Sequence, residues 1–255
     1  MLNQKLMNPY KISFREKQIL AGLFLSKYDE AGLKALEFKT FKEAFNIIGY
    51  ALGARPASIK NYRDEFDPVF SKTRLGWHKR QRRDYCISVA EKYGNMDMRT
   101  LASIVRSFFP EEMPDEKPDK GNTKGDTTSF AKRLATGLAA EHYFQSHAGS
   151  IEEFRSYEIE ETTKHGCGYD FRLWPSDSNP YIVVEVKGIM ETSGTLNLTA
   201  KEYDVAQFLK ERYILFVVKN FREAPFHETY KNPIRNIRFD RQENIVVQTT
   251  WRTRI

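Results

Sequence analysis

The sequence predicts an α+β protein, in which an all-helical N-terminal domain precedes a mixed α/β domain built on a sheet flanked by helices. Two stretches with helical periodicity in the first half each begin at a capping box. Short runs rich in Val, Ile, Phe and Tyr, separated by turn residues, fill the second half. A stretch rich in Pro, Gly and charge separates them. We therefore expect a helical domain at 1–109, a linker at 110–127 and a sheet domain at 128–255.

The helices of the first half are predicted from their start signals. Capping boxes at Ser13–Glu16 and Thr40–Glu43 should open the first two helices, and Gly53 should end the second. Pro56 suits the first turn of a third helix. One more helical stretch, at about 85–109, should complete the domain.

The second and third helices, joined by a short turn, have the outline of a helix-turn-helix. A helix-turn-helix places its second helix in a DNA groove, and the side chains that would face the groove are Ser58, Lys60, Asn61 and Arg63. The alternative is a helical hairpin that contacts no DNA, because such hairpins are common in all-helical domains.

Most of the positive charge follows this pair. Between residues 55 and 83, nine basic residues stand against the three acidic residues Asp64, Glu65 and Asp67; the basic ones are Arg55, Lys60, Arg63, Lys72, Arg74, Lys79, Arg80, Arg82 and Arg83. We expect phosphate contacts from Lys79, Arg80, Arg82 and Arg83, and an exposed ring at Trp77. A solvated charged face is the alternative.

The composition agrees with a polyanionic partner and excludes several other classes. The formal net charge of +6 and the pI near 9.1 favour nucleic acid. No apolar run is long enough for a membrane span and no signal peptide is evident, so we expect a cytoplasmic protein without a membrane partner. Cys86 and Cys167 form no zinc motif and should be small buried residues. Without a Gly-rich phosphate loop, no nucleotide cofactor is expected.

The second half should begin with a helix at about 128–146. Strands are expected at 169–174, 181–186, 213–218 and 244–248, with a helix at about 200–211 between the second and third. This order of elements is typical of a mixed α/β sheet.

Charged residues interrupt two of these strands. Asp170 lies near the start of the first strand, while Glu185 and Lys187 lie on the next. The strand period of two puts Glu185 and Lys187 on one face and the valines between them on the other. Because charges on an otherwise apolar strand are costly unless they are paired or bind a metal, the three side chains indicate a site.

The oxygen ligands of this site suit Mg²⁺. Asp170 and Glu185 would supply carboxylates and Val186 a backbone carbonyl. The metal would neutralise the scissile phosphate of a nucleic acid and acidify a water molecule. Lys187 would orient that water and offset the charge that develops in the transition state.

This pattern resembles the PD-(D/E)XK nuclease superfamily, with Asp170 as the lone aspartate and Glu185-Val186-Lys187 as the tripeptide. Tyr169 stands where the superfamily name has proline. Over residues 132–233 the chain also resembles the nuclease-like domain at the C-terminus of NO VEIN proteins, through the further motifs Gly137–Glu141, Leu198–Glu202 with Ala206, and Tyr213–Val218.

The resemblance implies a restriction-endonuclease-like fold and further roles around the site. Glu141, on the helix before the sheet, would reach the metal directly or through a water. Thr199 and Lys201 would contact the DNA backbone, whereas Glu202 suits the capping box that Thr199 begins better than it suits catalysis.

A basic helical domain joined to such a nuclease domain resembles a small type II restriction endonuclease. It would cleave a specific site in double-stranded DNA with Mg²⁺, as a homodimer whose two active sites cut both strands. The alternatives are a nuclease that requires a methylated base, and a DNA-binding regulator without catalytic activity.

Overall fold

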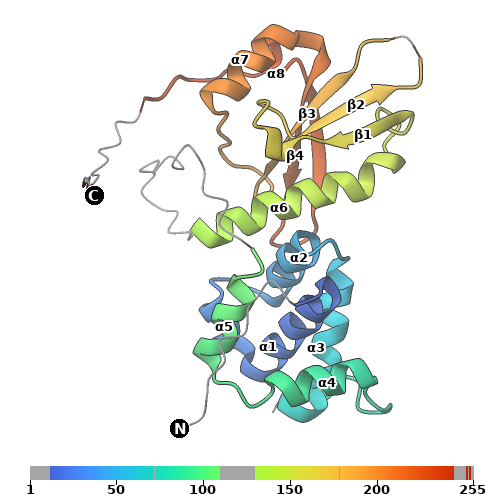
Figure 1. Cartoon of the computed structure of the whole chain (residues 1–255), viewed down its shortest axis with the longest axis vertical. Helices are drawn as coiled ribbons and strands as arrows, with labels where there is room; N and C mark the ends of the chain where they lie inside the picture. Colours follow the sequence, from blue (N-terminus) through green and yellow to red (C-terminus); the bar gives the residue numbers. More distant parts are fainter. Residues whose placement is uncertain are drawn as a thin grey trace.

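A five-stranded sheet and a set of N-terminal helices lie on opposite sides of one long helix, α6 (Phe130–His147) (Figure 1). The computed structural model describes residues 12–71, 73–109, 130–177, 179–243, 251 and 253. The predicted α+β class, with helices first and a mixed sheet after them, is confirmed.

The N-terminal region consists of α1 (Phe14–Ala35), α2 (Phe41–Ala51), α3 (Pro56–Phe70), α4 (Asp84–Tyr93) and α5 (Met98–Arg106). The first two begin as predicted, because Ser13 and Thr40 accept hydrogen bonds from the backbone N–H groups of Glu16 and Glu43. Pro56 occupies the first turn of α3, and Gly53, at φ +62°, lies in the turn before it.

The prediction of one helix over 85–109 was wrong, since α4 and α5 are separate. The α4 helix ends at Tyr93, and the Asp97 side chain accepts a hydrogen bond from the N–H of Thr100 to start α5. An N-terminal cap of this kind satisfies a backbone donor that a continuous helix would bond internally. The chain can therefore change direction between the two helices.

The sheet has the strand order β1-β2-β3-β4-β5, and its strands are β1 (Tyr157–Glu161), β2 (Phe171–Pro175), β3 (Ile182–Gly188), β4 (Tyr213–Lys219) and β5 (Phe226–Lys231). Among the described strands, only β3 and β4 pair in parallel, joined through α7 (Ala200–Leu209); the other pairs are antiparallel. A short helix, α8 (Pro233–Asn236), and the 3-10 turns 148–150, 163–165 and 210–212 complete the described elements. Three predicted strands are confirmed as β2, β3 and β4, whereas β1 and β5 were missed.

Opposite faces of the sheet pack against different helices. Val184 and Val186 of β3 belong to the large core that includes α6. Val183, on the other face, packs in a second cluster with Ala206 and Leu209 of α7. Because side chains alternate along a strand, Glu185 and Lys187 lie on the α7 face.

The helical region and the sheet share one core. Buried residues of α1, α2, α6 and the sheet form a single cluster, with α2 packed along α6. Polar contacts add to this packing: the Asn46 amide donates to the carbonyl oxygens of Phe221 and Glu223 at 2.8 and 3.1 Å, and Lys132 pairs with the buried Glu43 at 2.6 Å.

Replacing Asn46 by alanine tests this junction. The variant leaves the buried Phe221 carbonyl without its donor, so we expect the free energy of unfolding to fall by about 1–3 kcal/mol. Urea denaturation measures the change, with the exposed Asn61→Ala as a control expected to stay within about 0.5 kcal/mol of wild type. Equal effects of the two variants would show that the contact contributes nothing.

Two predictions fall on residues outside the described part of the chain, namely the linker at 110–127 and the strand at 244–248. The division into two domains stays a prediction. Among the described residues, no helix combines the length and apolar character needed to cross a bilayer.

Candidate active site

Asp170 and Glu185 lie across from one another where β2 begins. Phe171 pairs with Val184 in the antiparallel register, so the next residue outward on each strand, Asp170 and Glu185, share a face. The Asp170 Oδ2 atom accepts a 2.8 Å hydrogen bond from the backbone N–H of Val186. The Asp170 side chain thus accepts the hydrogen bond that a backbone carbonyl would accept in a regular strand. This bond fixes the orientation of the carboxylate.

Lys187 bridges two glutamates. Its Nζ atom lies 2.6 Å from Glu185 Oε1 and 2.8 Å from Glu202 Oε2. Glu202 also completes the predicted capping box with Thr199 at the start of α7, which is confirmed by both of its hydrogen bonds. Sequence reasoning missed the contact between Glu202 and Lys187. This contact makes α7 a support of the site, since Glu202 at the start of the helix holds the lysine.

Burial sets the charge balance of the group. It raises the pKa of Asp170 to about 6, against the lowering effects of the Val186 N–H and of Lys187. Burial also raises the pKa of Glu185 well above its ordinary value, and Asp170 and Glu202 raise it further. The pKa of Lys187 is lowered by burial but raised more by its two glutamates, so the lysine stays charged. The carboxylates of Asp170, Glu185 and Glu202 therefore share one cation, the ammonium group of Lys187.

These residues fit a divalent cation. Within the described part of the chain, Asp170 Oδ1 and Glu185 Oε2 accept no hydrogen bond, and the Asp170 carboxylate raises the pKa of Glu185. A cation between them would offset the desolvated negative charge. No group of three or more His, Cys, Asp or Glu side chains among the described residues is arranged to hold a metal ion. Protein ligation would consist of Asp170, Glu185 and the Val186 carbonyl, with water or substrate completing the shell.

Gly168 and Tyr213 shape the surroundings of the carboxylates. Gly168 has φ +83°, and a Cβ there would lie 2.9 Å from Val205 Cγ2 and 3.2 Å from the Lys201 carbonyl oxygen. Only glycine suits this position, which places the start of α7 and the exposed Lys201 beside the turn before Asp170. The buried Tyr213 donates to the Gly168 carbonyl at 3.2 Å. Burial, with Glu185 as the largest neighbouring charge, raises the pKa of this phenol, so Tyr213 stays protonated.

Glu141 lies on α6, which packs against the face opposite Glu185. One turn later on α6, Gln145 donates to Glu161 at 3.1 Å, and Glu161 is one of the charges that raise the pKa of Asp170. This side of α6 therefore approaches the edge of the sheet where the site lies. The predicted role of Glu141 at the metal stays a prediction.

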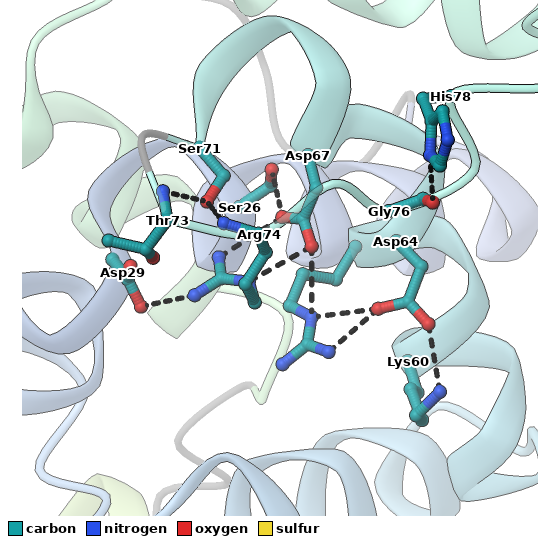
Figure 2. Close-up of polar contacts among 11 residues, drawn as sticks. Ser26, Asp29, Lys60, Asp64, Asp67, Ser71, Thr73, Arg74, Gly76 and His78 are labelled. Carbon is teal, nitrogen blue, oxygen red and sulfur yellow. Dashed lines mark hydrogen bonds and ion pairs between the residues drawn. The ribbon is translucent and has the colours of Figure 1, made fainter.

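Much of the basic run in the helical region is paired with buried acids. Figure 2 shows Asp67 between Ser26 and Arg74, with Arg74 reaching on to Asp29. Arg63 pairs with Asp64 at 2.7 Å and is only 11% exposed. The geometry therefore gives no support to the prediction that Arg63 contacts a DNA groove.

Glu65 fixes the end of the same run. The buried carboxylate accepts from the backbone and side chain of Arg83 and lies 3.3 Å from Arg80. The Trp77 ring, which was predicted to be exposed, is half-buried, and Arg80 lies over it, 4.2 Å from its centroid. These pairs hold the segment between α3 and α4 in place and offset part of its charge.

Other predicted DNA contacts remain accessible. Lys79 and Arg82 have no ion pair among the described residues, and Lys60 and Asn61 are exposed while Ser58 is half-buried. Lys60 pairs with Asp64 at 2.8 Å through a side chain that is 53% exposed. In Figure 1, α4 lies at the end of the helical region remote from the sheet. These residues and the carboxylate pair therefore lie in different parts of the molecule, and their roles stay predictions.

Replacing Asp170 by asparagine should stabilise the metal-free protein. The pKa of Asp170 is about 6 in the fold, above its ordinary 3.8, so the folded state holds this proton more tightly than the unfolded chain. The resulting stabilisation is complete below about pH 4 and is lost as the pH rises through about 6. Asparagine does not ionise and can still accept from the Val186 N–H.

Well above pH 6 we therefore expect Asp170→Asn to raise the free energy of unfolding by up to about 3 kcal/mol, the equivalent of two pKa units, because that shift already includes the attraction to Lys187. Urea denaturation in EDTA across this pH range measures the difference, which should vanish near pH 4. A wild type that equals or exceeds the variant in stability at pH 8 would contradict the assignment.

Comparison with known proteins supports a nuclease-like domain. Residues 140–231 match the family model described as Protein NO VEIN, C-terminal, a domain related to PD-(D/E)XK-like nucleases. The resemblance predicted from the sequence is thereby confirmed for this part of the chain. Neither the curated proteins nor the solved structures gave a match.

Proposed function

We propose that the chain is a magnesium-dependent endonuclease that cuts double-stranded DNA at specific sites, as a small type II restriction enzyme does. The observation that carries the proposal is a pair of carboxylates on one sheet face, the buried Glu185 and the half-buried Asp170, with Lys187 beside them. Buried carboxylates with raised pKa values are expensive to keep unless they serve a ligand or a reaction. The match of this segment to a nuclease-related family gives the pair its most economical explanation.

Bound Mg²⁺ would supply positive charge at the scissile phosphate. Asp170 and Glu185 would hold it, and the N–H of Val186 keeps Asp170 turned toward this position. Lys187 remains protonated between its two glutamates, so it acts as a cation and hydrogen-bond donor rather than as a base. It would orient the attacking water and stabilise the charge that develops on the phosphate.

Positioning of the DNA would involve both regions of the chain. Thr199 and Lys201 begin α7 next to the site, where Lys201 is exposed to a DNA backbone. Lys79 and Arg82, in the helical region, would contact phosphates further along the duplex. A homodimer on a palindromic sequence would bring two carboxylate pairs to the two strands.

Digestion of phage DNA tests the proposal and separates it from the alternatives. The purified chain should convert unmethylated DNA into discrete fragments with Mg²⁺, and into none with EDTA. Fragments from methylated DNA alone would indicate a nuclease that requires the modified base. Binding without cleavage of either substrate would contradict the proposal and favour a DNA-binding regulator.

A further inference from the structure

A strip of aromatic and arginine side chains extends from the carboxylate pair along the same face of the sheet. Asp170, the residue before β2, shares this face with Arg172 and Trp174 of β2 because side chains alternate along a strand. The register that pairs Leu173 with Ile182 places Trp174 opposite Tyr181, and their ring centroids lie 5.1 Å apart. We call Arg172, Trp174, Tyr181 and Arg212 the stacking strip.

The two arginines of the strip lie against its rings. The Arg172 guanidinium carbon is 5.1 Å from the Tyr181 centroid and 5.4 Å from that of Trp174. Arg212 approaches Tyr181 to 5.6 Å and forms no ion pair within the described part of the chain. Its charge is therefore free to meet an anion such as a phosphate.

The strip is both open and preorganised. Trp174 is 41% exposed, because α7 packs on Val183 and Tyr213, nearer the centre of the sheet. Glu160 accepts from the Trp174 indole at 2.9 Å and pairs with Arg172 at 3.4 Å. The planes of ring and guanidinium are thus fixed before a ligand arrives, which lowers the entropy lost on binding.

We propose that the stacking strip binds unpaired bases of the nucleic acid whose backbone lies at Asp170 and Glu185. This proposal rests on the proposed function and specifies its substrate as DNA with an opened or single-stranded segment beside the cut. The faces of a paired base are covered by its neighbours in the duplex, whereas an unpaired base can stack on an aromatic ring. The positive charge of Arg212 would pair with a phosphate of the same strand. Asp170 and Trp174 are four strand residues apart, about 13 Å, which corresponds to about four stacked nucleotides at roughly 3.4 Å each.

Binding in EDTA tests the strip independently of cleavage. Fluorescence anisotropy of a labelled oligothymidylate measures single-strand affinity, and a labelled blunt duplex of equal length serves for comparison. We expect Trp174→Ala to weaken single-strand binding about tenfold and to leave duplex binding unchanged. Trp174→Phe, which keeps a ring, should retain most of the affinity.

Two further variants test whether a loss of single-strand affinity has another cause. Phe208→Ala removes an aromatic ring that is 80% exposed on α7 and should bind both probes as wild type does. Tyr181→Leu removes the second ring and keeps an apolar side chain, so it replaces Trp174→Ala should that variant fail to fold. We expect Tyr181→Leu to lose affinity for the single strand and to keep its affinity for the duplex.

The outcomes separate this inference from the proposed function. Wild-type affinity of both ring-deletion variants for oligothymidylate would overturn the inference, as would equal losses on both probes or no single-strand binding by the wild type. Selective loss in EDTA would support it even for a chain that cleaves no DNA with Mg²⁺, in which case only the proposed function fails.

Discussion

Glu185→Gln should lower the rate of Mg²⁺-dependent DNA cleavage at least about a thousandfold, since a catalytic metal supplies several kcal/mol and each 1.36 kcal/mol corresponds to tenfold in rate. The substitution keeps the shape of the side chain and removes the charge that would hold the cation. Lys187 retains Glu202 as a partner at 2.8 Å, so no lone cation is left buried. The fold should survive, and the loss would be one of chemistry.

Two matched variants test whether the loss of cleavage rate is specific to the carboxylate pair. Glu202→Gln removes the support of Lys187 without touching the proposed metal ligands, and should lower the rate by about ten- to a hundredfold. Glu153→Gln makes the same chemical change at an exposed position and should cut DNA as wild type does. Single-turnover rates measure all three, and cleavage by Glu185→Gln within tenfold of wild type would refute the catalytic role.

Asp67→Ala should have the largest effect on stability, lowering the free energy of unfolding by about 3–5 kcal/mol, the cost of breaking a buried ion pair from one side. Asp67 is 1% exposed. Its carboxylate accepts from Ser26 at 2.7 Å and from two nitrogens of Arg74 at 2.9 and 3.0 Å (Figure 2). Its loss leaves the Ser26 hydroxyl without an acceptor and removes one of the two carboxylates that hold Arg74.

An exposed ion pair provides the control for this prediction. Glu152 and Arg155 pair at 3.2 Å with side chains that are 87% and 63% exposed, so Glu152→Ala should change the free energy of unfolding by less than about 0.5 kcal/mol. Guanidinium denaturation measures both variants. A small cost at Asp67 would mean that Arg74 finds equivalent partners and that the network does not fix the segment between α3 and α4.

The sequence was most informative where a pattern has one geometric solution. Alternation places Glu185 and Lys187 on one strand face whatever the rest of the fold does. The short turn after β2 makes a hairpin, which brings Asp170 opposite Glu185. The capping box likewise predicts both the start of α7 and the local partner of Glu202.

Contacts between distant segments could not be predicted in this way. The contact between Lys187 and Glu202 depends on where α7 packs on the sheet, and the sequence does not specify that position. The basic run is similar: its charge excess is visible, but the burial of Glu65 and Asp67 against it is not. The stacking strip could not be predicted either, because it depends on the register between β2 and β3.

The two missed strands lack the apolar runs that mark a strand. Three of the five residues of β1, Tyr-Glu-Ile-Glu-Glu, are charged, and β5 contains only exposed and half-buried residues. Both lie at the edges of the sheet, where one side of the strand meets solvent. The break between α4 and α5 was missed because apolar periodicity continues on both sides of Gly94, although Gly94 and Asp97 carry the stop and start signals.

The most direct test of the proposed active site is whether the carboxylate pair binds a divalent cation. Calorimetric titration of Mn²⁺ into the wild type should reveal one site, with the affinity at least about tenfold lower in Asp170→Asn. Because that substitution is expected to stabilise the fold, a loss of binding would not reflect unfolding. Equal affinity in the two proteins, or no binding by the wild type, would contradict the assignment of Asp170 and Glu185 as the metal site.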